Sequence, residues 1–331
     1  MDLDDSRVTP TSLHVYVAVD GDPASITPGG DDDPFFRQLR LRVRDFAQLS
    51  RGTVEDVPED ARVLVGSRID ATLLARRPEL MSIVVPWSGI PPSLRASVHD
   101  AGRADLQILN VHHNAPSAAE VGLGLLLAAT RGIPQLDRPL RRGDWRSRYQ
   151  PRPSRCLNGG KATILGRGAI GQRLHEALAA LGMTVRMLGR PTSGPRWTPR
   201  ALAAEVAASD VLLIAIPGGP DTAGIVDAAV LDAMPGGVVV NVGRGSVIEE
   251  AALFERLSDG RLFAAGLDVW WNVPKTIDAR AETMPSSFPF HELDNVVMTP
   301  HVGGGLGEPD IESRRAAAVA AVLETQVSRS R

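Results

Sequence analysis

Short apolar runs alternate with stretches of helical spacing along most of the chain, a pattern typical of parallel α/β sheets. In the first part, the pattern predicts strands over 13–19, 62–65, 82–85 and 106–111. Helices are predicted over 34–49, 70–75 and 91–101. The segment 20–33 is rich in Gly, Pro and Asp, so we expect an exposed loop there.

A second and longer series of the same kind begins at Ala162. Its predicted strands cover 162–165, 184–188, 211–216, 238–242, 263–267 and 295–299. Its predicted helices cover 170–181, 199–208, 227–233 and 249–257, with a terminal helix over 310–327. Strands that alternate with helices in this number predict a doubly wound α/β sheet.

The two series are joined by a further predicted helix. Ser117-Ala118-Ala119-Glu120 has the spacing of a capping box, and the apolar stretch 121–130 continues it. Gly132 and Pro134 are expected to end the helix. Because this stretch is apolar on nearly every face, we expect the helix to be buried.

Composition narrows the class of protein. The chain has 331 residues, of which 43% are hydrophobic and 23% charged, enough for two ordinary cores. The net charge of −3 gives no global attraction to nucleic acid. One cluster of arginines is the exception, and we expect it to be a solvated or subunit-contacting surface: Arg138, Arg141, Arg142, Arg146, Arg148, Arg152 and Arg155.

The cellular compartment is predicted from the lengths of apolar runs, the start of the chain and the number of cysteines. No apolar run is long enough to span a bilayer, and the acidic start of the chain lacks the apolar segment of a secretory signal. The single cysteine, Cys156, cannot form an internal disulfide, which fits a reducing compartment. We therefore expect a cytoplasmic protein with neither a membrane nor a nucleic acid as partner, and we predict no metal site.

The first candidate site is the loop Gly166-Arg167-Gly168-Ala169-Ile170-Gly171. A predicted strand enters this G-x-G-x-x-G pattern and a predicted helix leaves it, which is the setting of a dinucleotide-binding turn. The helix N-terminus would supply N–H groups and partial positive charge to the phosphates. An ordinary strand–helix turn is the alternative.

The end of the next predicted strand bears on which dinucleotide binds. NAD-binding domains commonly place a carboxylate there for the ribose 2′-hydroxyl. This chain has Gly189-Arg190 instead, followed by Thr192. Because a guanidinium suits a 2′-phosphate, the sequence favours NADP(H) over NAD(H). The alternative is that Arg190 only stacks beside the adenine of NAD.

Several motifs, found in order, resemble the D-isomer-specific 2-hydroxyacid dehydrogenase family, of the glyoxylate/hydroxypyruvate reductase kind. The helix over 121–133 resembles the family's linking helix, and Ser209-Asp210-Val211 with Pro217 and Thr222 resembles its cofactor-side strand and loop. The remaining matches are Asn241-Val242-Gly243-Arg244-Gly245, Ala265-Gly266-Leu267-Asp268-Val269 and Thr299-Pro300-His301-Val302-Gly303-Gly304. The resemblance covers nearly the whole chain and is more specific than any single motif.

The resemblance implies hydride transfer between NAD(P)(H) and a 2-keto acid or D-2-hydroxy acid. It implies that Arg244 holds and polarises the substrate and that His301 is the acid in reduction, roles that suit a guanidinium fork and an imidazole. The implied substrate-binding residues are Ser88, Gly89, Ile90, Asn114 and Trp270. Beyond the glycine loop, Gly189, Arg190 and Thr192, the implied cofactor-binding residues are Pro217, Thr222, Val242, Gly243, Asp268 and Gly303.

The family pattern is broken at one catalytic position. A glutamate that pairs with the histidine is usual five residues after the aspartate, and Val273 stands there. Three explanations are open: catalysis by Arg244 and His301 alone, replacement by Glu282 or Glu292, or a catalytically impaired dinucleotide-binding sensor or interaction module. Formate-dehydrogenase-like oxidation is a lesser alternative, because Gly303 replaces the serine expected in such enzymes.

The resemblance also implies an organisation. We expect two Rossmann-like domains, each a doubly wound parallel sheet with helices on both faces, and a cleft between them. Residues 1–119 and 302–331 would form a flavodoxin-like substrate domain, and residues 120–301 the NAD(P)-binding domain. A homodimer is expected from the family. The pair Trp270-Trp271 is expected either at the mouth of the active site or at a subunit interface.

Overall fold

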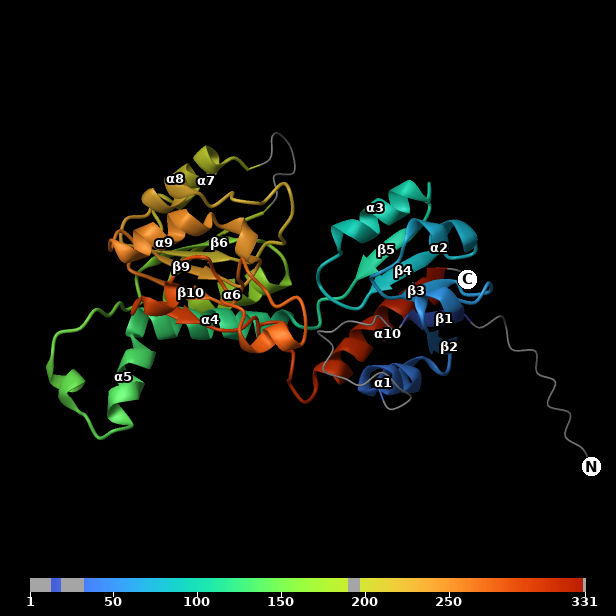
Figure 1. Ribbon diagram of the computed structural model, residues 1–331, viewed down its shortest axis with the longest axis horizontal. Helices are drawn as coiled ribbons and strands as arrows, with labels where there is room; N and C mark the ends of the chain where they lie inside the picture. Colours follow the sequence, from blue (N-terminus) through green and yellow to red (C-terminus); the bar gives the residue numbers. More distant parts are fainter. Residues whose placement is uncertain (1–12, 19–32, 190–196, 330–331) are drawn as a thin grey trace, which may run out of the picture. The chain divides into compact units, whose positions relative to one another are not determined.

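The computed structural model describes residues 13–18, 33–189 and 197–329, so Arg190, Thr192 and nearly all of the predicted loop 20–33 lie outside the described residues. The chain forms two compact units (Figure 1). Unit 1 comprises Met1–Asn114 and Gly307–Arg331, and unit 2 comprises Ala115–Leu306. The predicted cleft concerns the relation of the two units and stays a prediction.

Unit 1 is built on a parallel sheet in the order β2-β1-β3-β4-β5. Its strands are β1 (Leu13–Ala18), β2 (Ala47–Gly52), β3 (Val63–Val65), β4 (Ser82–Val85) and β5 (Gln107–Asn110). Its helices are α1 (Pro34–Val43), α2 (Ala71–Arg76), α3 (Pro92–Asp100) and α10 (Ile311–Arg329), with the 3₁₀ turn η1 (Val54–Asp56). This strand order is the flavodoxin-like one.

The two faces of this sheet are covered by different helices, as the period of two in its strands requires. Val15, Val17 and Val63 belong to a core with α1 and α10. Tyr16 and Leu64, one position along, belong to a core with α2 and α3. Strands buried on both faces explain why they read as continuous apolar runs.

Unit 2 contains the second parallel sheet, in the order β11-β10-β9-β8-β6-β7. Its strands are β6 (Lys161–Leu165), β7 (Thr184–Leu188), β8 (Val211–Ile214), β9 (Val238–Asn241), β10 (Ala264–Leu267) and β11 (Val296–Met298). Its α-helices are α4 (Ala115–Arg131), α5 (Ile133–Leu140), α6 (Ala169–Ala180), α7 (Pro199–Val206), α8 (Ala228–Asp232) and α9 (Glu250–Ser258). Short 3₁₀ turns are η2 (Arg146–Tyr149), η3 (Gly245–Val247), η4 (Asp278–Ala281) and η5 (Phe290–Glu292).

Helices cover both faces of this sheet as well. α4 and α6 share one core with β6, β8 and β9, and α7, α8 and α9 share the other. The strand order changes direction between β6 and β8, and such a switch point is where open α/β sheets bind ligands. The predicted fold class is thus confirmed for both units.

Two local predictions were wrong. The helix predicted over 34–49 ends at Val43, and β2 begins at Ala47. Phe35, Leu39 and Val43 carry the helical spacing, but β2 is an edge strand in which only Ala47 is buried, so it has little apolar signal of its own. Its pairing with β1 decides its conformation.

The predicted capping box at Ser117 is the second error. Helix α4 already begins at Ala115, which places Ser117 inside the first turn and buries it. Pro116, which is well tolerated in a first turn, was the signal for the earlier start. Gly132 does end α4, in the left-handed region with a φ of 63°, and α5, which the pattern did not predict, follows at once.

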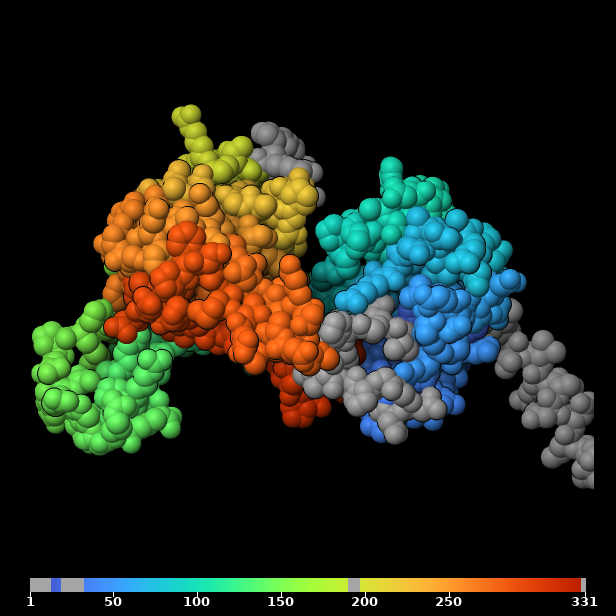
Figure 2. Space-filling model, in the orientation of Figure 1, coloured from blue at the N-terminus to red at the C-terminus, as the bar shows by residue number. Residues whose placement is uncertain are grey.

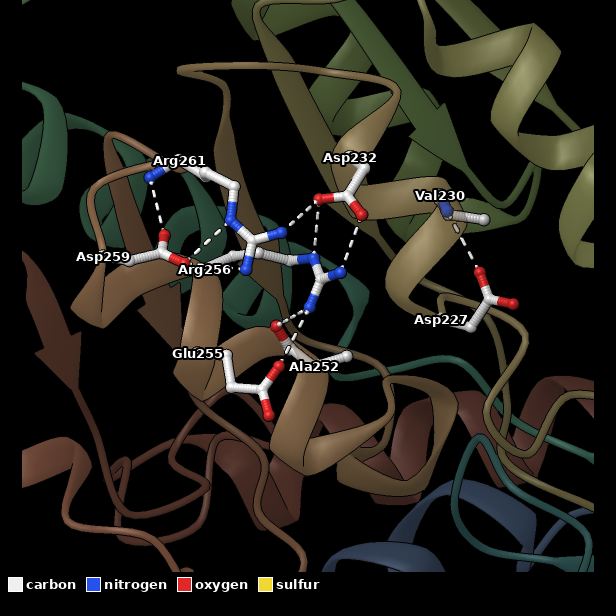
Figure 3. Close-up of polar contacts among 8 residues, drawn as sticks. All are labelled: Asp227, Val230, Asp232, Ala252, Glu255, Arg256, Asp259 and Arg261. Carbon is white, nitrogen blue, oxygen red and sulfur yellow. Dashed lines mark hydrogen bonds and ion pairs between the residues drawn. The ribbon is translucent and has the colours of Figure 1, made fainter.

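A buried arginine joins two helices of unit 2 (Figure 3). Arg256 on α9 is 6% exposed, and its guanidinium donates to both carboxylate oxygens of Asp232 at 2.9 and 2.7 Å. Arg261 donates to the same carboxylate and to Asp259. These contacts, Arg256 first, hold the pKa of Asp232 below its ordinary value. The network fixes the end of α8 against α9.

We therefore expect Arg256→Met to lower the free energy of unfolding by about 2–4 kcal/mol, because a paired, buried guanidinium is lost. Urea unfolding followed by circular dichroism measures this. The matched control is Arg44→Met, which removes the exposed pair with Asp45 and should leave the free energy of unfolding nearly unchanged. Equal effects of the two substitutions would contradict the structural role of Arg256.

Candidate functional site

The glycine loop joins β6 to α6, and two of its glycines are required by geometry. Gly166 has a φ of 130°, and a Cβ there would lie 2.6 Å from the carbonyl oxygen of Ala215. A Cβ on Gly171 would lie 2.1 Å from the carbonyl oxygen of Gly166. Helix and strand can approach each other this closely only without those side chains.

The N-terminus of α6 has the features of an anion site. Gly168 is its N-cap residue, its side-chain position faces open space, and no side chain caps the helix. The first turn carries no acidic residue. The free N–H groups and helix dipole there fit the phosphates of a dinucleotide, which Gly168, Ala169 and Ile170 would hold.

Arg167 lies beside the end of β7. Its side chain packs against Gly189, the residue that follows this strand, so a side chain at Gly189 would displace it. Trp197 donates its indole N–H to the Gly189 carbonyl at 2.7 Å, and its ring packs on the core of unit 2. An exposed cation, and no carboxylate, thus stands at the described end of β7.

The loop after β8 contacts the candidate catalytic arginine. Thr222 donates its hydroxyl to the carbonyl of Pro217 at 2.9 Å, which closes the loop. Within it, Gly218 packs beside the Cβ and Cγ of Arg244. The predicted cofactor-side residues and Arg244 are therefore neighbours.

The turn that carries Arg244 is fixed by Asn241, which is 1% exposed. Its side-chain oxygen accepts from the N–H of Gly243, and its amide donates to the carbonyl of Arg244, both at 3.0 Å. Val242 is buried and donates its N–H to Ile214 of β8. A bidentate amide at this position limits the backbone of Arg244 to one conformation.

A second buried side chain fixes the loop of His301. Asp268 is 1% exposed and follows β10. One of its carboxylate oxygens accepts from the Thr299 hydroxyl at 2.7 Å and the Val302 N–H at 2.8 Å, and the other accepts from the Gly303 N–H at 2.9 Å. The carboxylate therefore holds the backbone on both sides of His301.

His301 has an unusual conformation and a shifted pKa. Among the residues that the structure describes, it is the only non-glycine residue with a positive φ, 57°. Such a conformation costs about 1–3 kcal/mol and persists where the surroundings impose it. Although the residue is exposed, loss of solvent around its imidazole and then the charge of Arg244 lower the pKa of His301, while Asp268 opposes them.

Neither Glu282 nor Glu292 is among the charges that shift the pKa of His301. Both glutamates are exposed, and Val273, at the position of the missing glutamate, is exposed as well. Burial lowers the pKa of Arg244, which remains a cation because its ordinary value is very high. The carboxylate that acts on His301 is Asp268.

The two adjacent tryptophans use their indole N–H groups inside unit 2. Trp270 donates to the carbonyl of Thr299 at 2.8 Å and so supports the strand end before His301. Trp271 donates to Ile248 and stacks on Phe290, with ring centroids 5.5 Å apart. Both are partly buried, so their rings contribute to the fold of unit 2 itself.

The predicted substrate loop lies in unit 1, after β4. Asn110 donates to the carbonyl of Ser88 at 2.7 Å, and the Ser88 hydroxyl donates to the side-chain oxygen of Asn114 at 3.1 Å. Gly89 and Ile90 are half-buried beside them. The structure thus brings Ser88, Gly89, Ile90 and Asn114 together, whereas Trp270 belongs to unit 2.

In unit 2 the candidate residues stand at the carboxyl ends of β6, β8, β9, β10 and β11, along one edge of the sheet. Asn241 was part of the predicted Arg244 motif but received no role of its own, although a polar residue that ends an apolar strand was a usable signal; Trp197 was not predicted at all. Within the described ranges, no three His, Cys, Asp or Glu side chains are grouped to hold a metal ion. No helix described here is both long and apolar enough to cross a bilayer.

Comparison with known proteins agrees with this arrangement. Residues 123–303 match the family described as "D-isomer specific 2-hydroxyacid dehydrogenase, NAD binding domain". The D-3-phosphoglycerate dehydrogenase of Mycobacterium tuberculosis is 33% identical over 76% of this chain and 47% of its own length. The 2-ketogluconate reductase of Gluconobacter oxydans is 32% identical over 71% of this chain and 73% of its own.

The chain spans about half the length of the phosphoglycerate dehydrogenases that it matches. A solved structure of a D-isomer specific 2-hydroxyacid dehydrogenase from Xanthobacter autotrophicus Py2, in complex with NADPH and MES, has the same fold, with a TM-score of 0.72 and 23% identity. That likeness covers 96% of this chain and 95% of the other. The chain belongs to the D-isomer specific 2-hydroxyacid dehydrogenase family.

Proposed function

We propose that this protein transfers a hydride between a nicotinamide cofactor and a 2-keto acid or D-2-hydroxy acid. The observation that carries the proposal is the pair Arg244 and His301, each held at a strand end by a buried polar side chain, Asn241 and Asp268 respectively. The family membership supports the same reaction. Unit 1 is the proposed substrate domain and unit 2 the proposed dinucleotide-binding domain.

Each candidate residue has a separate role in the proposed hydride transfer. The bound nicotinamide supplies or accepts the hydride. The guanidinium of Arg244 holds the substrate carboxylate and polarises the carbonyl, and His301 donates a proton to the carbonyl oxygen in reduction or takes it back in oxidation. The N–H groups of Ser88, Gly89 and Ile90 bind the carboxylate with Asn114, whose amide nitrogen remains available for a second contact.

The test is a panel of 2-keto acids with NADPH and NADH, followed by loss of absorbance. The panel contains glyoxylate, hydroxypyruvate, pyruvate, 2-ketogluconate and hydroxyphenylpyruvate. Robust turnover of at least one acid is expected. Tight cofactor binding with no turnover would instead favour the catalytically impaired binding module.

The pH dependence follows from the pKa of His301. Reduction needs the protonated imidazole, whose pKa is lowered by desolvation and by Arg244. The acid form is therefore lost as pH rises through a value below the ordinary 6.5, so kcat/KM for reduction should fall from a lower pH than an unperturbed histidine gives. Oxidation, which needs the neutral form, should persist to lower pH. A reduction profile that breaks at or above the ordinary value would contradict this assignment.

We further propose that NADP(H) is preferred over NAD(H). The described end of β7 offers the cation Arg167 and no carboxylate, which favours a 2′-phosphate. The ratio of kcat/KM with NADPH and NADH measures the preference. Arg167→Gln should lower this ratio by about tenfold, the effect of one charge-assisted contact, and an unchanged ratio would count against the role of Arg167.

The proposed assembly is a homodimer, and α5 with the residues up to Tyr149 is the proposed contact. No residue of α5 is buried, and Figures 1 and 2 show this segment standing out from the rest of unit 2. Ile133, Leu140, Trp145 and Tyr149 are exposed on it. Light scattering of the protein and of a Trp145→Glu/Tyr149→Glu variant tests this, with Leu41→Glu in unit 1 as the control; equal masses for all three would oppose it.

A cytoplasmic location belongs to the same proposal. The one cysteine, Cys156, is an exposed free thiol, which fits a reducing compartment.

A further inference from the structure

An arginine in unit 1 lies over two aromatic rings that belong to different elements. Arg315, on the second turn of α10, has its guanidinium carbon 4.4 Å from the ring centre of Phe35 on α1. The same carbon is 5.2 Å from the ring of Trp87, in the loop after β4. One cation therefore joins α10 and α1 to the loop that continues into Ser88, Gly89 and Ile90.

The environment of Arg315 makes these contacts strong. Its side chain is only 16% exposed, and burial is the main reason that its pKa is lowered. Glu312, one turn earlier, pairs with it and is buried to a similar degree. The Nε atom of Arg315 is buried without a hydrogen-bond partner among the described residues. A cation held mainly by rings and a single carboxylate depends on the ring contacts more than an exposed arginine does.

The loop that follows Trp87 in the chain is held in place by packing and hydrogen bonds. Trp87 and Ile90 pack at the edge of the core formed with α2 and α3, and Asn110 and Asn114 hold Ser88. Trp87 therefore couples the position of α10 to that of the loop, because its ring contacts Arg315 and its backbone continues into Ser88. A displaced ring would move the N–H groups that follow it.

The positive charge of Arg315 also acts on His113, the residue before Asn114. Its Nδ1 atom is buried without a hydrogen-bond partner among the described residues. Its pKa is lowered to about 4 by desolvation, then by Arg315, by Arg314 and by the neighbouring His112. Two carboxylates act on Arg315: Asp33, the N-cap residue of α1, and Glu312 of α10. The imidazole is neutral at pH 7, next to the proposed substrate asparagine.

We propose that Arg315 is a positioning residue for substrate recognition: it fixes Trp87, and through Trp87 the carboxylate-binding loop beside Asn114. The proposal rests on the proposed function of this loop. In this proposal Arg315 does not bind the substrate, because its guanidinium is already paired with the carboxylate of Glu312.

The experiment compares Arg315→Gln and Arg315→Lys with the matched control Arg42→Gln. Arg42 joins the same two helices, because it donates to Ser313 of α10 at 3.0 Å, but the cation–π contacts with Phe35 and Trp87 found in the described part of the chain come from Arg315. In Arg315→Gln we expect KM for the keto acid to rise about tenfold to thirtyfold, with kcat and the KM for the cofactor nearly unchanged. Arg315→Lys keeps the charge and loses the planar stack, so its KM should lie between the two.

Two readouts do not depend on turnover. Proton NMR titration, with His113→Asn for assignment, should show the pKa of His113 rising from about 4 in Arg315→Gln and staying low in Arg315→Lys and Arg42→Gln. Calorimetry with oxalate, a probe for carboxylate recognition, should show about tenfold weaker binding to Arg315→Gln.

The measurements distinguish a positioning role of Arg315 from general helix packing and from failure of the proposed function. Equal losses in Arg42→Gln and Arg315→Gln would overturn the positioning role in favour of general helix packing. Unchanged oxalate binding and an unchanged KM in Arg315→Gln would overturn it directly. An unchanged titration of His113 would overturn the placement of the Arg315 charge beside this loop. If the unaltered protein turns over no keto acid, the proposed function fails, and calorimetry and NMR still decide the role of Arg315; absence of oxalate binding to every protein would overturn it too.

Discussion

Replacing His301 by alanine is expected to reduce kcat for keto-acid reduction by about 10²–10⁴-fold, the usual contribution of a positioned general acid. The backbone of the loop should survive, because Asp268 accepts from Thr299, Val302 and Gly303 and makes no use of the imidazole. The residual rate should lose the pH dependence that His301 imposes. Steady-state kinetics across pH, with cofactor affinity from NADPH fluorescence, measures both effects.

A surface histidine provides the matched control. His291 is exposed and lies 3.9 Å from Glu292, so His291→Ala should leave kcat within about twofold and the free energy of unfolding within about 0.5 kcal/mol. A His301→Ala enzyme with full activity would mean that the proton comes from elsewhere. An unfolded variant would mean that the left-handed loop depends on the imidazole after all.

The second large effect is expected at Gly171. Gly171→Ala places a Cβ 2.1 Å from the carbonyl oxygen of Gly166, and neither backbone can move without separating α6 from β6. We expect a loss of more than about 2 kcal/mol in the free energy of unfolding, together with loss of cofactor binding. Urea unfolding and NADPH fluorescence titration check these two effects separately.

Gly124→Ala is the same chemical change at a permissive place. A Cβ there meets nothing within 4 Å, and Gly124 is exposed on α4. This variant should be neutral or up to about 1 kcal/mol more stable, because alanine is the better helix former. If both variants bind NADPH normally, close approach at Gly171 is not what shapes the loop.

Most of the fold could be predicted because its strands carry a clear pattern: β4 is buried throughout, whereas the residues of the edge strand β7 alternate between exposed and less exposed. β4 and β7 occupy the predicted residues, since four or five apolar or alternating residues between clear turns leave few alternatives. β2 could not be predicted in this way. Its residues Ala47–Gly52 gain their conformation from pairing with β1, which a local pattern does not contain.

The candidate site was predictable to the level of motifs and no further. The motifs placed Arg244 after β9 and His301 after β11, but they could not show that Asn241 and Asp268 fix the backbones of these two residues. The positive φ of His301 has no signal in the residues around it. The contact of Arg315 with Trp87 joins residues far apart in the chain, and only the three-dimensional packing of unit 1 reveals it.

The structure also shows how the replacement of the family's glutamate by Val273 affects His301. With exposed Val273 in its place, His301 is left between the opposing effects of Arg244 and Asp268, and its pKa is lowered. Reduction at mildly acidic pH is therefore the condition in which the proposed chemistry should be sought first.

The most direct test of hydride transfer uses NADPH that carries deuterium at both C4 positions of its nicotinamide ring. The protein is incubated with the keto acid that it reduces fastest, glyoxylate excepted because glycolate has no D or L form, and the product is analysed by mass spectrometry and proton NMR. One deuterium at C2 of a hydroxy acid of D configuration, formed by the unaltered protein at least about 10²-fold faster than by His301→Ala, is the predicted result. A hydroxy acid without deuterium at C2, or no product from any acid of the panel, would contradict the proposed function.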